Sequence, residues 1–210
     1  MQSRFKSWPN GTRIAIAITP MFEVWPEGKG PANLLQRTQV KPGIVDRQAL
    51  TWPHYAGKEG VWRIIRILDR HGVPGTFCTN DFLAQEKVLW QGDANYIDLP
   101  RRVKTKHGTL VHIPHSDYTD NRVVWLSPRQ YYDVYKDTFD YLYANEPMAL
   151  MVMTVHSHFG GRPLMAAVFD KLLTYFAQFP DVWFARHREL AQWALDSGSD
   201  EVTYAQRFFA

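Results

Sequence analysis

The sequence predicts an α/β protein in which helices cover a largely parallel sheet or barrel. The first observation is that short, almost wholly apolar runs alternate with amphipathic helical patterns, which is typical of strands buried on both faces. The second is the order strand, long loop, helix, strand over residues 13–79, which is that of a β/α crossover unit. The length of 210 residues suits one domain with a full core.

The N-terminal third contains the first strand and the first helix. A strand is predicted over 13–19, and we expect Pro20 to close it. Residues 21–55 are rich in Pro, Gly and Trp without any period, so they form a long irregular loop of the kind that often carries function. A helix is predicted over 60–71, with Gly72 as its C′ residue. Its apolar stripe is Val61, Ile64, Ile65 and Leu68.

The rest of the chain continues the alternation. A second strand at 75–79 precedes a brief helix capped by Asp81, and residues 89–121 have the texture of strands and loops. Ser127 and Pro128 open the next helix. The remaining predicted elements are a strand at 148–155, a helix from Arg162–Pro163, a strand at 182–185 and a helix at 186–195.

The composition is that of a globular protein, with 45% apolar and 21% charged residues. The formal net charge is only +3 and its 24 basic residues are spread along the chain, so we expect no nucleic-acid partner. The basic stretch 101–107 is short, and we interpret it as a solvated loop or hairpin. No apolar run has signal-peptide or membrane-spanning length and Cys78 is the single cysteine, so we expect a cytoplasmic protein without membrane contact.

Chemically useful side chains follow the predicted strands. In parallel α/β folds the reactive groups lie just beyond the carboxyl ends of the strands. The first strand is followed by Glu23, and the strand 148–155 is followed by His156 and His158. The middle region offers Asp93, Asp98, His112, His115, Asp117 and Asp120.

These residues would suit the hydrolysis of a carbonyl-type bond, which needs a base for water, an acid for the leaving group and a group that holds the oxyanion. Glu23 and His156 could act as base and acid. Arg162, or a backbone N–H at Gly160–Gly161, could hold the oxyanion.

Each candidate also has a purely structural interpretation. Glu23 could be a solvated carboxylate in an aromatic loop, and the segment 154–164 could be a polar turn. We favour function for His156 and His158, because Asp, Asn or Ser would suffice for a polar turn. The case for His112 and His115 stays open. The histidines expected at helix ends or on the surface are His54, His71, His107 and His187.

A zinc site is the less favoured alternative. The His-x-His pattern at 156–158 and the His-x-x-His pattern at 112–115 could together supply nitrogen ligands. The sequence has no HExxH motif and no cysteine pair, however. We therefore expect no metal or other cofactor.

Six segments together resemble the polysaccharide deacetylase, or NodB-homology, family. The branch they resemble most contains the metal-independent allantoinases and cyclic imide hydrolases. The segments are WPNGTRIAIAI at 8–18, FEVWPEGKGP at 22–31, GVWRIIRILDRHGVPGTF at 60–77, GDANYIDLPRR at 92–102, HIPHSDYTDN at 112–121, and HSHFGGRPL with VWFARHRELAQW between 156 and 193.

The resemblance implies a distorted (β/α) barrel that hydrolyses non-peptide C–N bonds in acetamido sugars, ureides or imides. Glu23 matches the position of the family's catalytic base, and His156 that of the histidine acting as general acid. A small-molecule substrate would then lie in a cradle built by polar residues of the later segments. These substrate-binding candidates are Asp93, Asp98, His112, His115, His158 and Arg162.

The chain departs from the family pattern in two places. The acidic neighbour that zinc-dependent members carry is replaced by Val24–Trp25, and the family's His-x-x-x-His motif is absent. Relative to that pattern, we interpret the Asn80–Asp81 junction as the site of a missing block, which predicts a shortened barrel, an open sheet or a swapped oligomer. Because the missing strands would leave two unpaired edges, we expect a homo-oligomer in which a second subunit covers them. The alternative to an active hydrolase is a catalytically inactive member that serves as a small-molecule binding or assembly module.

Overall fold

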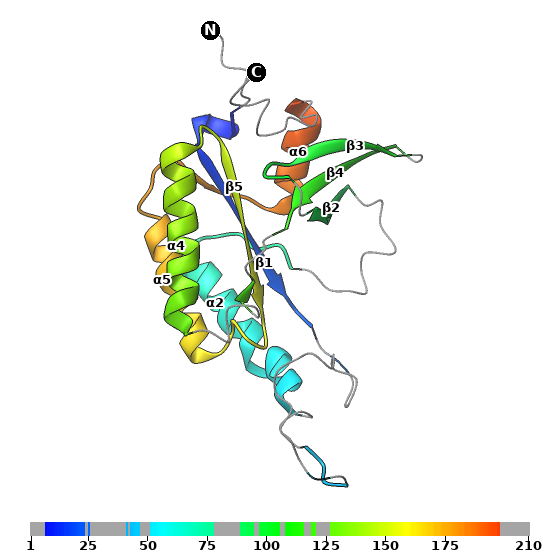
Figure 1. Ribbon diagram of the computed structural model, residues 1–210, viewed down its shortest axis with the longest axis vertical. Helices are drawn as coiled ribbons and strands as arrows, with labels where there is room; N and C mark the ends of the chain where they lie inside the picture. Colours follow the sequence, from blue (N-terminus) through cyan, green and yellow to red (C-terminus); the bar gives the residue numbers. More distant parts are fainter. Residues whose placement is uncertain are drawn as a thin grey trace.

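The computed structural model is an α/β fold of two three-stranded sheets and their helices (Figure 1). The prediction of the α/β class is thus confirmed. Three helices, α2, α4 and α5, cover one side of the first sheet, and the second sheet lies on the other side with α6 (Figure 1). The structure describes residues 7–23, 25, 41, 43–46, 51–77, 89–94, 97–105, 108–115, 119–120 and 127–197.

The first sheet is parallel and has the order β5-β1-β6. Strand β1 (Ile14–Met21) pairs with β5 (Ala149–His156) over its whole length, and β6 (Val182–Phe184) pairs with its first three residues. All but the last residue of β1 are buried, as its apolar run predicts.

Pro20 does not close β1, contrary to the sequence-based expectation, and it pairs with Val155. The carbonyls of Ile16 and Ile18 accept hydrogen bonds on the edge of β1 that faces away from β5. Alternate residues of a strand face the same edge, so Pro20 also faces away from β5. Its missing N–H therefore costs no bond to β5, and a proline at such a position does not interrupt the strand.

The predicted strand 75–79 is reduced, in the part that the structure describes, to one parallel bridge between Gly75 and Ile18. The N–H of Thr76 donates to the Ile18 carbonyl at 2.9 Å, so Gly75 and Thr76 lie along the same edge of β1 as β6. The predicted helix that Asp81 caps, Cys78 and the Asn80–Asp81 junction lie outside the described residues.

The second sheet has the order β2-β4-β3. Strand β2 (Trp90–Ala94) runs parallel to β4 (Gly108–Pro114), whereas β3 (Arg101–Thr105) runs antiparallel to it, so the basic stretch forms the hairpin that the sequence allowed. The described strands therefore make two sheets and not one continuous parallel sheet. Val111 and Ile113 of β4 share a core cluster with Ala15, Ala17 and Val152 of the first sheet.

The helices follow the sequence signals closely. Helix α2 (Val61–His71) ends at Gly72 in the left-handed conformation, with φ of 63°. Helix α4 (Pro128–Asn145) begins with a capping box between Ser127 and Gln130. Helices α5 (Pro163–Phe176) and α6 (His187–Ser197) lie where two helices were predicted.

The start of α2 differs from the prediction. A 3-10 turn (Trp52–His54) and a π-helical turn (Ala56–Gly60) precede it, so helical structure enters the predicted loop 21–55. Ile67 is buried in place of Ile65, which is only half-buried.

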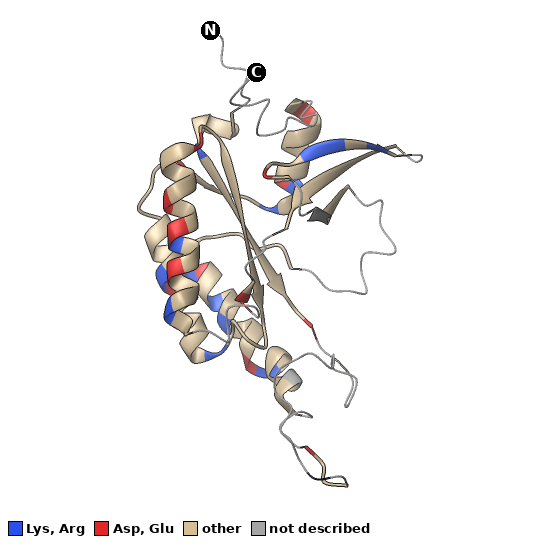
Figure 2. Ribbon diagram, in the orientation of Figure 1, with Lys and Arg blue, Asp and Glu red and all other residues tan. Residues whose placement is uncertain are grey.

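Charged side chains of both signs are interspersed along α2 and α4 (Figure 2). His71 ends α2, as expected, and its Nε2 lies 2.6 Å from an Asp170 oxygen on α5. Among the described residues, no helix is both long and apolar enough to cross a membrane.

Candidate active site

The strand register brings Glu23 and His156 to the same end of the first sheet. Met21 and His156 are the last paired residues of β1 and β5, and Glu23 follows Met21 by two positions. The N–H of Ser157 still donates to the Met21 carbonyl at 2.9 Å, so the segments that follow β1 and β5 remain adjacent beyond the paired residues. The predicted acid and base therefore lie together at the carboxyl end of two parallel strands.

His156 is held by Asp120, whose side chain is fully buried. One Asp120 oxygen lies 2.5 Å from Nδ1 of His156, and the other accepts the backbone N–H of His156 at 2.7 Å. A carboxylate only accepts hydrogen bonds, so Nδ1 carries a proton and Nε2 is the nitrogen left to exchange one with a substrate. The His156 side chain is 12% exposed.

The two titratable groups of this centre influence each other. Burial raises the pKa of Glu23, while the positive charge of His156 lowers it and the negative charge of Asp120 raises it. For His156, burial lowers the pKa, but the hydrogen bond and charge of Asp120 and the charge of Glu23 raise it above its ordinary value. The arrangement thus favours a protonated imidazole beside a carboxylate, the pairing that acid–base catalysis of hydrolysis requires.

His158 lies in an aromatic cage next to this pair. Its ring centroid is 5.3 Å from that of Trp25, 4.9 Å from that of Trp52 and 5.5 Å from that of His156. The side chain is fully buried, and neither ring nitrogen has a hydrogen-bond partner among the described residues. Burial, with the charges of His156 and Arg162, lowers the pKa of His158 to about 3, so the ring is neutral.

Three glycines allow the turn after β5 to pack closely, two of them against the start of α2 and one against Asp120. A Cβ on Gly60 would lie 1.7 Å from the Ser157 carbonyl oxygen, and one on Gly161 would lie 2.4 Å from the Gly60 Cα. A Cβ on Gly160 would lie 2.8 Å from an Asp120 oxygen. The glycine pair of the sequence motif therefore serves close packing, and the Gly160 N–H, considered above for an oxyanion, instead donates to the His156 carbonyl at 2.7 Å.

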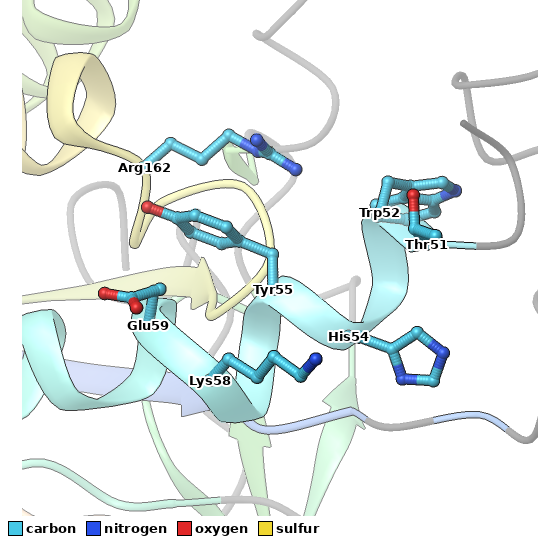
Figure 3. A pocket seen from close by; sticks show the side chains of 7 residues that line it. All are labelled: Thr51, Trp52, His54, Tyr55, Lys58, Glu59 and Arg162. Atoms are coloured by element: carbon cyan, nitrogen blue, oxygen red, sulfur yellow. The ribbon is translucent and has the colours of Figure 1, made fainter. Parts of the chain in front are cut away.

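Arg162 connects this turn to a neighbouring cavity. Its Nε donates to the His158 carbonyl at 3.0 Å, and its guanidinium carbon lies 4.3 Å from the centre of the Tyr55 ring. The cavity has a volume of about 450 Å³ (Figure 3). It is lined by Thr51, Trp52, His54, Tyr55, Lys58, Glu59 and Arg162.

Solved structures share this arrangement of strands and helices. A probable polysaccharide deacetylase from Pseudomonas aeruginosa PAO1 superimposes with a TM-score of 0.75 at 19% identity, over 90% of this chain and 93% of that one. PuuE allantoinase superimposes with a TM-score of 0.74 at 18% identity, over 90% of this chain and 92% of that one. The chain has the polysaccharide deacetylase fold. The sequence itself matches no protein-family profile and no curated protein.

Four predicted substrate residues of this deacetylase fold belong to the second sheet. His112 lies within β4 and is half-buried, His115 follows β4 and is exposed, and Asp98 is exposed between β2 and β3. Asp93 belongs to β2, but its side chain is not described. His156 contacts Asp120 and His158, and the role of Asp98, His112 and His115 as substrate contacts stays a prediction.

His187 was expected at a helix end or on the surface, and it begins α6 but is buried. Its Nε2 lies 3.3 Å from the Thr19 hydroxyl, and its ring lies 4.7 Å from that of Trp90. Burial, with the charge of His115, lowers the pKa of His187 to about 4. The predicted helix 186–195 placed His187 near a helix start, but only the approach of the two sheets buries it.

The described residues do not assemble the zinc site that the sequence left as an alternative. Within the described part of the chain, no three His, Cys, Asp or Glu side chains are grouped as metal ligands would be. The four histidines considered for zinc are divided between the two sheets. His112 lies within β4 and His115 follows it, whereas His156 ends β5 and His158 lies in the turn after β5. Nδ1 of His156 is already paired with Asp120.

Asp120 is the residue whose role the sequence did not reveal. It appeared only as one of several acidic residues in the middle region, 36 positions before His156. Its position after β4, on the sheet opposite β5, was the available signal, but the pairing depends on how the two sheets close.

Proposed function

We propose that the chain hydrolyses a non-peptide C–N bond in a small ureide, cyclic imide or N-acetyl substrate. The observation that carries this proposal is the position of Glu23 beside the Asp120-bound His156 at the ends of two parallel strands. The fold supports it, since the similar structures include a probable polysaccharide deacetylase and an allantoinase.

In this reaction the Glu23 carboxylate accepts a proton from water as the water oxygen attacks the carbonyl carbon. The new C–O bond forms a tetrahedral intermediate, and the C–N bond then breaks. His156, protonated on both nitrogens, donates the Nε2 proton to the departing nitrogen, so the leaving group departs as a neutral amine or amide. Asp120 keeps the ring oriented and stabilises its positive charge.

The test is the turnover of allantoin, hydantoin, succinimide and N-acetylglucosamine oligomers by the purified chain and two variants. Glu23→Gln keeps the size of the side chain but cannot accept the proton, and His156→Ala removes the acid. Each should lower kcat/KM by roughly 10²- to 10⁴-fold, the usual contribution of a general acid or base. Asp133→Asn and His71→Ala make matched changes on the helices and should retain activity.

Unchanged rates in both Glu23→Gln and His156→Ala would overturn the assignment. A folded wild-type chain that binds members of this panel without turning them over would instead favour an inactive binding module.

A further inference from the structure

The guanidinium of Arg162 is held in place but has no acidic partner among the described residues. Its Nε is occupied by the His158 carbonyl, and the plane lies over the Tyr55 ring. Neither amino group of the fork takes part in a described hydrogen bond or ion pair, and both belong to a side chain that lines the cavity. An arginine oriented in this way presents two parallel N–H donors, which match the two oxygens of a carboxylate.

The cavity has a second cation and aromatic walls. Figure 3 shows the Lys58 ammonium and the Arg162 guanidinium extending to the same side of Tyr55, toward His54 and Trp52, whereas the Glu59 carboxylate points the other way. Lys58 is exposed and has no ion pair among the described residues. The side of the cavity that faces Trp52 is therefore positively charged and partly apolar.

This cavity adjoins the acid–base centre through the turn that follows β5. Its wall residue Trp52 contacts the ring of His158, and Arg162 binds the carbonyl of the same residue. The ring of His158 is in turn 5.5 Å from that of His156. Arg162 is thus separated from the acid–base centre by a single residue, His158.

We infer that this cavity recognises a carboxylate, so that the preferred substrate is an amide, imide or ureide carrying a carboxylate a few bonds from the scissile carbonyl. The inference rests on the proposed function, since it defines the substrate of that same site. Arg162 would bind the carboxylate bidentately, and Lys58 would add a second positive charge on the same side of Tyr55 (Figure 3). His158, being neutral, adds no competing charge between the two subsites.

The decisive probes are hydantoin-5-acetic acid and hydantoin-5-acetamide, which share ring and side-chain length and differ in charge. Their dissociation constants are measured calorimetrically on the Glu23→Gln chain, in which turnover is blocked. The acid should bind about tenfold more tightly than the amide at low salt, as one charge-assisted bidentate contact at a partly exposed site provides. The difference should shrink as salt is added.

Four substitutions locate the effect, each made in the Glu23→Gln chain. Arg162→Gln and, separately, Lys58→Gln should reduce the preference for the acid, whereas Arg66→Gln removes the same charge from an exposed position of α2 and should leave it unchanged. Arg162→Lys should retain only part of the preference, because an ammonium keeps the charge and loses the fork. Melting temperatures show whether each variant is folded, and the exposed Lys58 offers a test that does not disturb the turn.

Equal binding of acid and amide, or a preference that survives loss of both Arg162 and Lys58, would overturn the inference. The proposed function is judged separately by turnover in the wild-type chain. Hydrolysis of neutral hydantoin without any preference for the acid leaves the function standing and removes the inference. Selective binding of the acid without turnover of any probe leaves the carboxylate subsite standing and removes the proposed function.

Discussion

Asp120 binds His156 through both of its carboxylate oxygens, one on the backbone N–H at 2.7 Å and one on Nδ1 at 2.5 Å. The first contact holds the last residue of β5, and the second orients the ring that this strand carries. One buried side chain thus sets both the position and the protonation of the predicted acid.

Replacing Asp120 with Asn should separate position from charge. An amide oxygen can still accept the backbone N–H, but the variant loses the negative charge that raises the pKa of His156. We expect the His156 pKa, followed by NMR titration of its ring protons, to fall, and kcat to fall by roughly 10²-fold or more. Asp170→Asn, beside His71, is the matched control. An unchanged His156 titration would show that Asp120 does not control its protonation.

The pH dependence of hydrolysis should be bell-shaped. Activity needs Glu23 ionised and His156 protonated, so it rises as pH increases through the Glu23 pKa and falls as pH increases through the His156 pKa. Both pKa values lie above their ordinary values, so both limbs should be displaced toward higher pH. In Asp120→Asn the alkaline limb should move to lower pH, and the acid limb should not move to higher pH. A profile of kcat/KM with no alkaline limb would contradict the role given to His156.

The close approach of Gly60 to the turn after β5 should make any substitution of this glycine strongly destabilising. Gly60 has ordinary helical angles, φ −64° and ψ −50°, so an alanine is opposed only by the Ser157 carbonyl, 1.7 Å from its Cβ. We expect Gly60→Ala to lower the free energy of unfolding by about 3 kcal/mol through overpacking.

Gly72→Ala is the comparison for Gly60→Ala, because a Cβ there meets nothing within 4 Å and only its φ of 63° is unfavourable. It should cost about 1 kcal/mol, the strain of one left-handed residue. Denaturant titration of both variants measures the difference. Equal losses would mean that the backbone at Gly60 relaxes away from the contact.

Acid should destabilise the fold before the carboxylates titrate. His187 has a pKa of about 4 in the folded chain against about 6.5 when unfolded, so only the unfolded chain takes up its proton between these values. Stability from this group is complete above pH 6.5 and decreases as pH falls toward 4, by at most on the order of 3 kcal/mol. His158, with its pKa of about 3, adds to the loss over the same range and below it.

The free energy of unfolding measured from pH 7 to pH 4 tests this expectation. His187→Gln should flatten the dependence, whatever its effect at neutral pH. His115→Gln removes a positive charge that lowers the His187 pKa. The free energy of unfolding should therefore fall less in this variant as the pH decreases from 7 to 4. An identical slope in His187→Gln and the wild-type chain would show that His187 is not the group that titrates.

The elements of this fold were largely predictable because their signals are local. The apolar β-branched run of β1, the stripe and Gly72 of α2, and Ser127 with Pro128 at the start of α4 each depend on neighbouring residues. Pro20 was misjudged for a non-local reason, since whether a proline interrupts a strand depends on which neighbour its missing N–H would face.

The α/β class, the position of Glu23 and His156 after buried strands, and the resemblance to the polysaccharide deacetylase fold all follow from the sequence alone. Which of the many polar residues meet depends instead on how the strands and sheets pack. Pairing of β1 with β5 joins residues 21 and 156, and closure of the second sheet brings Asp120 to His156 and buries His187. Such contacts span tens to more than a hundred residues, and no local periodicity encodes the partner, because packing of whole sheets selects it.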